Sequence, residues 1–219
     1  MAPQLFIGVT IGNGLEKLID EMGMKEFMKS FENYISWKLG LNEELETKTN
    51  KIGNKCKNIY PSLKELMRTN LKEIKNKWPK KIPKGIIHGD LFIDNIFFKK
   101  NKFYGYIDFY FACNDFLMYE IAICINALCF DKKRGKFIFN KKKSKNLIKG
   151  YSKIRMLSKS EKKSLNILCK GAALRYLLTR SYDYLNTPKN AIIKIKDPKE
   201  YIQKLKIHNK FDNFKNYYN

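Results

Sequence analysis

The sequence predicts an α+β fold that is mostly helical and carries one small β-hairpin. Apolar residues recur at helical spacing over residues 61–77, and residues 115–130 are almost continuously apolar, as in a buried helix. Between these segments, residues 96–107 read as strand, turn, strand, with the turn at Lys100–Lys102. The 219 residues, 44% of them hydrophobic, suffice for one large domain, or for one domain plus a small extension.

The N-terminal part of the chain is predicted to be a separate helical segment. Residues 15–38 show apolar positions at helical spacing, interrupted at Gly23, whereas residues 41–58 are polar and fit either an exposed helix or a loop. We therefore divide the chain into an N-terminal helical segment over residues 1–40 and a main domain over residues 41–219.

Local signals place the first elements of the main domain. Pro61 suits the first turn of a helix, and the pair Trp78-Pro79 ends that helix. Residues 86–87 then form a short strand. Residues 131–143 are rich in lysine and are predicted to be a basic loop.

Two helices are predicted near the C-terminus. Ser158 and Glu161 have the spacing of a capping box, which opens a long helix that reaches about Asn186. Asp197 and Pro198 begin a last helix, with the aspartate as N-cap and the proline at the first position.

The segment from residue 88 to residue 108 carries the strongest chemical signal. A phosphotransferase needs a carboxylate to receive the proton of the attacking hydroxyl, and an amide and a second carboxylate to hold Mg²⁺ on the phosphates of ATP. His88, Asp90 and Asn95 fit the His-x-Asp-x-x-x-x-Asn spacing of a kinase catalytic loop. Asp108 follows an apolar run, where a second metal ligand is expected. This order predicts Asp90 as the catalytic base and Asn95 and Asp108 as Mg²⁺ ligands.

Other polar residues are expected to support this site. His88 is expected to hold the loop through hydrogen bonds rather than to act in the reaction. Asp94 fits either a contact behind the metal ligands or a cap of the loop, and Asp115 fits either loop support or a helix cap. Arg180 fits equally well a clamp for a substrate carboxylate and a structural ion pair, whereas a structural role is preferred for Arg175.

Two expectations concern the surroundings of the site. Arg175 and Arg180 are five residues apart on one helix, so we expect that they do not closely share a face. Tyr110 and Phe111 are expected to belong to the core rather than to a binding pocket.

The formal net charge of +23, from 44 Lys and Arg against 21 Asp and Glu, would suit a protein that binds nucleic acid or an anionic surface. Only five of the basic residues are arginines, and the lysines are scattered along the whole chain. This distribution indicates a compositional bias on solvated faces, so no nucleic-acid partner is expected.

The cysteines and the apolar segments indicate an intracellular protein. The five cysteines form no Cys-x-x-Cys pair, which favours reduced, buried thiols over a zinc or redox site. No secretory signal is recognised, and the longest apolar stretch, residues 121–130, is interrupted by Asn126 and too short for a bilayer. We expect a cytoplasmic protein with no membrane partner.

Several further motifs extend the signal beyond the catalytic loop. They are His-Gly-Asp-Leu-Phe-Ile-Asp-Asn-Ile-Phe-Phe (88–98), Gly-Tyr-Ile-Asp-Phe-Tyr-Phe-Ala-Cys-Asn-Asp (105–115), Tyr-Glu-Ile-Ala-Ile-Cys-Ile-Asn-Ala-Leu-Cys-Phe (119–130), Gly-Ala-Ala-Leu-Arg-Tyr-Leu-Leu-Thr-Arg (171–180), Tyr182-Asp183, Lys196-Asp197-Pro198 and Tyr201. Together they resemble the homoserine kinases of the aminoglycoside-phosphotransferase-like, or protein-kinase-like, superfamily, over about residues 78–208. General aminoglycoside or choline phosphotransferases would share only the four residues of the catalytic loop and metal site.

The resemblance implies both a fold and an activity. The fold would be the C-terminal, catalytic lobe of a kinase, formed by residues 41–219, with a small hairpin that carries the metal ligands. The activity would be transfer of a phosphoryl group from ATP, with Mg²⁺, to the hydroxyl of L-homoserine in threonine biosynthesis. Two alternatives remain open: a kinase for another small hydroxyl compound, of the aminoglycoside or choline type, and a non-catalytic binding fragment.

The chain departs from the family pattern at two places. Glu120 stands where the family usually has aspartate, which keeps the charge. The glycines at positions 8, 12 and 14 lack the Gly-x-Gly-x-x-Gly spacing of a phosphate-covering loop, and no strand of the Val-Ala-x-Lys type follows them. We therefore expect residues 1–40 to be a remnant of, or linker to, an N-terminal lobe whose ATP cradle is missing, and we expect little activity from the 219 residues alone.

Overall fold

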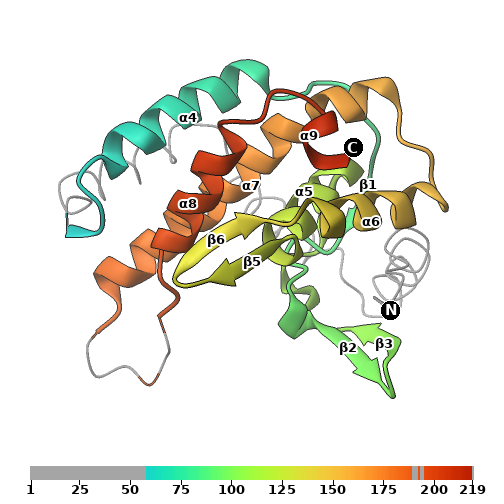
Figure 1. The fold of residues 1–219 in the computed structure, drawn as a ribbon, viewed down its shortest axis with the longest axis horizontal. Helices are drawn as coiled ribbons and strands as arrows, with labels where there is room; N and C mark the ends of the chain where they lie inside the picture. The colour runs from blue at the N-terminus through green and yellow to red at the C-terminus, as the bar shows by residue number, and fades with distance from the viewer. Residues whose placement is uncertain (1–57, 189–191, 193–194, 219) are drawn as a thin grey trace, which may run out of the picture.

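The computed structural model describes residues 58–188, 192 and 195–218, and these form a mostly helical domain with small antiparallel hairpins (Figure 1). The predicted α+β class is confirmed. The helices are α4 (Leu63–Lys77), α5 (Leu117–Leu128), α6 (Lys141–Ser152), α7 (Lys159–Asn186), α8 (Lys199–His208) and α9 (Lys215–Tyr218). The helical segment predicted for residues 1–40, and the division of the chain at residue 40, lie outside the described residues.

In the part of the chain that the structure describes, six short strands form three antiparallel pairs. The strands are β1 (Lys84–Ile87), β2 (Ile96–Lys99), β3 (Lys102–Tyr106), β4 (Cys113–Phe116), β5 (Phe130–Lys133) and β6 (Lys136–Phe139). The pairs are β1 with β4, β2 with β3, and β5 with β6. The predicted hairpin is β2–β3; it turns at Lys100 and Asn101, which both have positive φ, and it projects away from the helices in Figure 1.

The core lies around α5 and α7, as Figure 1 shows. Helix α5 is apolar on all sides, and its residues from Met118 to Asn126 are all buried. Helix α7 packs against α4, α5 and α8. Because a helix that is apolar all round must be enclosed by other elements, the sequence of α5 by itself explains its central position.

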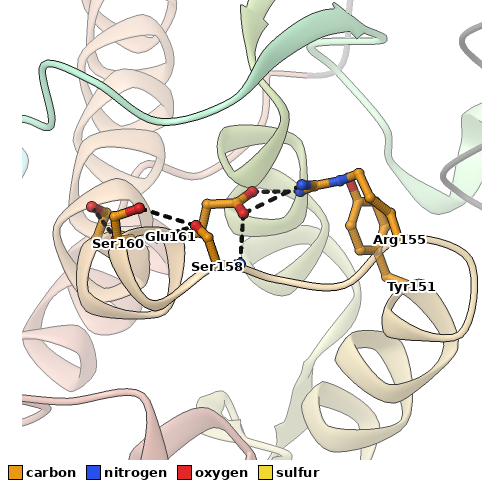
Figure 2. A network of polar contacts seen from close by, with 6 residues as sticks. Tyr151, Arg155, Ser158, Ser160 and Glu161 are labelled. Carbon is orange, nitrogen blue, oxygen red and sulfur yellow. Dashed lines mark hydrogen bonds and ion pairs between the residues drawn. The ribbon is translucent and has the colours of Figure 1, made fainter.

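A capping box starts α7 where the sequence predicts it (Figure 2). The Glu161 N–H donates to Ser158 Oγ at 3.2 Å, and Glu161 Oε2 accepts from the Ser158 N–H at 2.9 Å. The same carboxylate pairs with the guanidinium of Arg155, which also donates through Nε to the Tyr151 hydroxyl at 2.8 Å. The start of α7 is therefore tied to the end of α6.

The predicted basic loop over residues 131–143 is wrong. This segment contains most of the β5–β6 hairpin and the first turn of α6. The hairpin turns at Arg134 and Gly135, both with positive φ, and the Phe130 and Phe139 rings meet across it at 5.4 Å. Alternating phenylalanines on one face outweigh the high lysine content of the strands.

Two helix boundaries differ from the prediction. Residues expected at the start of α5 form β4 instead, so that the helix begins at Leu117. Helix α8 begins at Lys199, whose N–H donates to Asp197 Oδ1 at 2.8 Å, and the short α9 follows it.

The expectation of reduced, buried thiols is confirmed for the cysteines that the structure describes. Cys113, Cys124, Cys129 and Cys169 are free and buried, and burial raises the pKa of each thiol, to about 12 for Cys113 and Cys129. No helix within the described ranges is both long and apolar enough to cross a membrane.

Candidate active site

The predicted catalytic loop follows β1, and His88 holds it in place. The ring of His88 is buried; its Nε2 lies 2.8 Å from the Ile107 carbonyl oxygen, and its Nδ1 accepts from the Asp90 N–H at 3.3 Å. This pattern requires the neutral ring with its hydrogen on Nε2. Both contacts are to backbone, which agrees with the structural role expected for His88.

Only glycine fits at position 89, between His88 and Asp90. Its φ is +77°, and a Cβ at this position would lie 2.4 Å from the Phe111 carbonyl oxygen. Its N–H donates to Glu120 Oε2 at 2.9 Å, and its carbonyl oxygen accepts from Arg175 Nη1 at 2.8 Å. The backbone of the loop is thus held from two helices, α5 and α7.

Glu120, at the position where the family usually has aspartate, still contacts the catalytic loop in this chain. Its carboxylate is buried, and burial raises its pKa, while hydrogen bonds from the backbone N–H groups of Gly89 and His88 oppose the shift. The longer side chain reaches the Gly89 N–H, so the contact to the loop is present.

Asp90 follows with its side chain on the wall of a cavity of about 440 Å³. Its Oδ1 accepts a hydrogen bond from the Tyr176 hydroxyl at 2.9 Å. Its backbone carbonyl oxygen accepts from the Phe92 N–H and from Asn95 Nδ2, both at 2.9 Å. The predicted base is therefore anchored through its main chain and through one carboxylate oxygen.

The two predicted metal ligands lie on neighbouring parts of the chain. Asn95 ends the short 3₁₀ helix Ile93–Asn95, and its carbonyl oxygen accepts from the Ile107 N–H at 3.2 Å, one residue before Asp108. Asp108 has left-handed backbone (φ 60°, ψ 59°) and is exposed. An aspartate in this strained conformation is typical of functional sites.

The donor atoms present fit Mg²⁺. The Asn95 Nδ2 donates to Asp90, which leaves its Oδ1 available, and neither that oxygen nor the Asp108 carboxylate has a hydrogen-bond partner among the described residues. Among the residues that the structure describes, no group of three or more His, Cys, Asp or Glu side chains is placed to hold a metal ion. One amide and one carboxylate are a usual protein share when phosphates and water complete the coordination.

The cavity beside Asp90 lies between the catalytic loop and α7. It is lined by Asp90, Phe92, Phe111, Arg175, Tyr176, Thr179, Arg180, Asp183, Thr187, Ile195 and Lys196. Its volume lies within the range of about 300–1,000 Å³ that is typical of small-molecule sites. The lining combines three cationic side chains with two carboxylates, which suits a small ligand with both charges.

An ion-pair network holds Arg180 at the cavity. Its Nη1 donates to Glu200 Oε2 at 2.6 Å, and its guanidinium lies over the Tyr201 ring at 4.5 Å. The buried Lys204 donates to the other oxygen of Glu200 at 2.5 Å and to the Asn126 carbonyl oxygen at 2.7 Å. Arg180 therefore forms a structural ion pair and lines the cavity at the same time.

The other two predicted support residues, Asp94 and Asp115, do not line the cavity. Asp94 is exposed and pairs with Lys196 at 3.7 Å, which joins the catalytic loop to the segment before α8. Asp115 lies in β4 opposite Gly85 of β1, and its Oδ1 accepts from the Phe116 N–H at 2.7 Å. Burial raises the pKa of Asp115. It does not act as the N-cap of α5, which is Phe116.

The expectation that Tyr110 and Phe111 belong to the core rather than to a pocket is wrong in part. Arg175 and Arg180 both line the cavity, although they are five residues apart on α7 and donate to different partners, the Gly89 carbonyl oxygen and Glu200. Phe111 lines the cavity as well, while it also packs against the hydrophobic core. Tyr110 is largely exposed.

The sequence reasoning missed several residues of the cavity. Tyr176, Thr179, Asp183 and Lys196 received no role, although three of them lie on α7. The sequence pattern that could have revealed them is a row of polar residues, three and four positions apart, along one face of a helix whose other residues there are mostly buried.

Known proteins similar to this chain are phosphotransferases. A family model described as "Phosphotransferase enzyme family" matches residues 30–138. Homoserine kinases of Allorhizobium ampelinum and Rhodospirillum rubrum are each 47% identical over 150 residues, which is 68% of this chain and 46% of theirs. The homoserine kinase of Agrobacterium fabrum is 45% identical over 159 residues, 73% of this chain and 48% of its own.

The chain spans about half the length of the curated relatives it matches. The family match contains the whole catalytic loop and both predicted metal ligands, since it runs from residue 30 to residue 138. The fold, the loop geometry and these similarities lead to one conclusion: the chain belongs to the phosphotransferase enzyme family.

Proposed function

We propose that this chain is the catalytic portion of a homoserine kinase, which transfers the γ-phosphoryl group of ATP to the hydroxyl of L-homoserine. The observation that carries the proposal is the position of Asp90, which lines a cavity together with Arg180 and Asp183. The similarity to homoserine kinases over 68–73% of the chain supports the same acceptor. The fold would correspond to the C-terminal lobe of a protein-kinase-like enzyme.

The chain's own residues divide the work of phosphoryl transfer. Asp90 accepts the proton of the attacking hydroxyl, a role that contributes roughly 10²–10⁴-fold to rate. Asn95 Oδ1 and the Asp108 carboxylate would hold Mg²⁺ against the phosphates. When bound, the ion would offset negative charge on the transferring group.

The charges around the cavity favour an amino acid over the alternative acceptors. Arg175, Arg180 and Lys196 bring positive charge to the lining, and Asp183 and Asp90 bring negative charge. A zwitterion such as L-homoserine can place its carboxylate near the cations and its ammonium near Asp183. An aminoglycoside is a polycation and choline has no carboxylate, so both would meet the three cations without compensation.

The test is a phosphoryl-transfer assay with a panel of acceptors. L-homoserine, choline and an aminoglycoside are each incubated with ATP and Mg²⁺, both with the 219-residue chain and with the chain joined to any coding sequence that precedes it. We expect transfer to L-homoserine, and we expect Asp90→Asn to reduce turnover about 10²–10⁴-fold with unchanged circular dichroism. Preference for another acceptor, or full turnover of Asp90→Asn, would contradict the proposal.

A further inference from the structure

One contact of the predicted base comes from outside the catalytic motif. The Tyr176 hydroxyl donates to Asp90 Oδ1 at 2.9 Å, and it lies 3.4 Å from the Gly89 carbonyl oxygen. Tyr176 belongs to α7 and is 86 residues further along the chain than Asp90. None of the expected roles of the catalytic loop accounts for this tyrosine.

The position of the Tyr176 ring is fixed by packing on several sides. The ring is buried and meets Phe92 edge to face, with the centroids 5.1 Å apart. Tyr201 packs against it at 5.2 Å, and the Arg175 guanidinium lies 4.9 Å from its centroid. A hydroxyl on such a ring is presented at a defined point, at little further cost in conformational entropy.

The Tyr176 hydroxyl can only act as a donor toward Asp90. Burial raises the pKa of Tyr176 well above its ordinary value, and the negative charge of Asp90 adds to the shift, while Arg175 opposes it. The hydroxyl therefore keeps its proton over the whole working range of pH. A carboxylate oxygen is an acceptor, so the direction of the hydrogen bond is determined.

The contacts within the catalytic loop hold the backbone of Asp90 but do not restrict the rotation of its side chain. Its N–H is held by His88, and its carbonyl oxygen is held by the Phe92 N–H and by Asn95 Nδ2. With Oδ1 bound to Tyr176, the rotation of the carboxylate is restricted. Oδ2 is left without a hydrogen-bond partner in the part of the chain that the structure describes, on a residue that lines the cavity.

We propose that Tyr176 is a positioning residue, which holds one carboxylate oxygen of Asp90 so that the other oxygen meets the acceptor hydroxyl. This inference rests on the proposed function, because it assigns Asp90 as the base. Holding a reacting group in one orientation removes a rotational cost from the barrier, and small misplacements of such a group reduce rate by one or two powers of ten.

The first test removes only the hydroxyl. Tyr176→Phe keeps the ring and its packing, and we expect turnover to fall roughly 10–100-fold, while KM for L-homoserine changes less than about 2-fold. The matched control is Tyr201→Phe. This variant loses a buried hydroxyl that has no hydrogen-bond partner among the residues that the structure describes, and its turnover should equal that of the wild type. Equal turnover of Tyr176→Phe and wild type would overturn the proposal.

The second test separates positioning from a purely structural role. A double-mutant cycle combines Tyr176→Phe with Asp90→Asn, and the residual rates of all four proteins are compared. If the hydroxyl acts through the carboxylate, Tyr176→Phe changes the residual rate of the Asp90→Asn protein less than about 2-fold. Equal losses in both backgrounds would mean that Tyr176 only stabilises the fold.

A third measurement does not need activity. The protein is labelled with ¹³C at the side-chain carboxyl of aspartate, and the Asp90 signal is assigned from its loss in Asp90→Asn. We expect this signal to shift in Tyr176→Phe and to stay in place in Tyr201→Phe. Failure of the chain joined to any preceding coding sequence to phosphorylate any acceptor would reject the proposed function, whereas an Asp90 signal unmoved by Tyr176→Phe would reject the role of Tyr176.

Discussion

Glu200 accepts a hydrogen bond from Arg180 at 2.6 Å, and this ion pair joins the wall of the cavity to α8. Lys204 donates to the same carboxylate, so one acidic group serves two cations. Burial alone would raise the pKa of Glu200, but Lys204 and Arg180 hold it below its usual range. The carboxylate therefore stays charged, and the remaining N–H groups of Arg180 are available to a ligand.

The first prediction concerns this arginine. Arg180→Lys keeps the positive charge but loses the planar fork, so one side chain can no longer serve both Glu200 and a substrate carboxylate. We expect KM for L-homoserine to rise about 10-fold or more. KM for ATP should stay within about 2-fold of the wild-type value, because the arginine would contact only the acceptor.

Steady-state kinetics with each substrate in turn would measure both constants. The control is Arg134→Lys, the same substitution at the exposed turn of the β5–β6 hairpin. If KM for L-homoserine is the same in Arg180→Lys and in the control, Arg180 has only its structural role.

The second prediction concerns the backbone of the catalytic loop. Gly89 and Gly135 both have φ +77°, but only a Cβ at Gly89 would collide with another group, the Phe111 carbonyl oxygen at 2.4 Å. Gly135→Ala should cost about 1 kcal/mol from its backbone conformation alone. Gly89→Ala should cost clearly more, about 2–4 kcal/mol, and urea unfolding would measure both. Equal costs would show that the loop yields freely at Phe111.

The third prediction concerns pH. His208 is buried, its Nδ1 lies 3.0 Å from the Tyr217 hydroxyl, and its Nε2 lies 3.2 Å from Asn126 Oδ1. Burial, with Lys204 and Lys170 nearby, lowers its pKa to about 3 from its ordinary value of 6.5. Between about pH 3 and pH 6.5, His208 therefore binds a proton in the unfolded chain but not in the folded chain.

The free energy of unfolding should fall as the pH drops from 6.5 toward 3, at up to about 1.4 kcal/mol per pH unit from His208. The contribution is complete above pH 6.5. His208→Gln removes the titrating group, so its unfolding free energy should depend less steeply on pH in this window. Parallel urea titrations at several pH values would reveal the difference, and identical slopes would show that another group is responsible.

The fourth prediction concerns the metal ligands. Asp108→Asn keeps an oxygen but removes the charge that attracts a hard cation. We expect the Mg²⁺ concentration for half-maximal activity to rise about 10-fold or more, and excess chelator to abolish activity of the wild type. Asp212→Asn, an equal change of charge at an exposed position, is the control. An unchanged Mg²⁺ requirement in Asp108→Asn would exclude Asp108 as a ligand.

The elements that were predicted correctly are those with local signals. The capping box at Ser158 and Glu161 contains its own partners three residues apart, so the start of α7 needs no tertiary information. The loop from His88 to Asn95 is also one contiguous motif, whose catalytic role stays a prediction, and its glycine is explained by a positive φ and by the close approach of the Phe111 carbonyl oxygen.

The features that were missed depend on contacts between distant residues or on competing signals. Tyr176 meets Asp90 across 86 residues of sequence, and no periodicity along α7 can reveal that partner. The lysine-rich sequence of the β5–β6 hairpin predicts a loop, because its lysines mask the pairing of Phe130 with Phe139. The apolar residue type of Phe111 predicts a core position; Phe111 does pack against the core, but it also lines the cavity.

The long separation between Asp90 and Tyr176 also affects how the chain matures. Synthesis proceeds from the N-terminus, so β1 and the catalytic loop leave the ribosome well before α7. Until then Gly89 lacks Arg175, and Asp90 lacks its tyrosine. The nascent chain therefore carries every residue of the motif, but the contacts that order the Asp90 side chain and the Gly89 backbone form only after α7 has been synthesised.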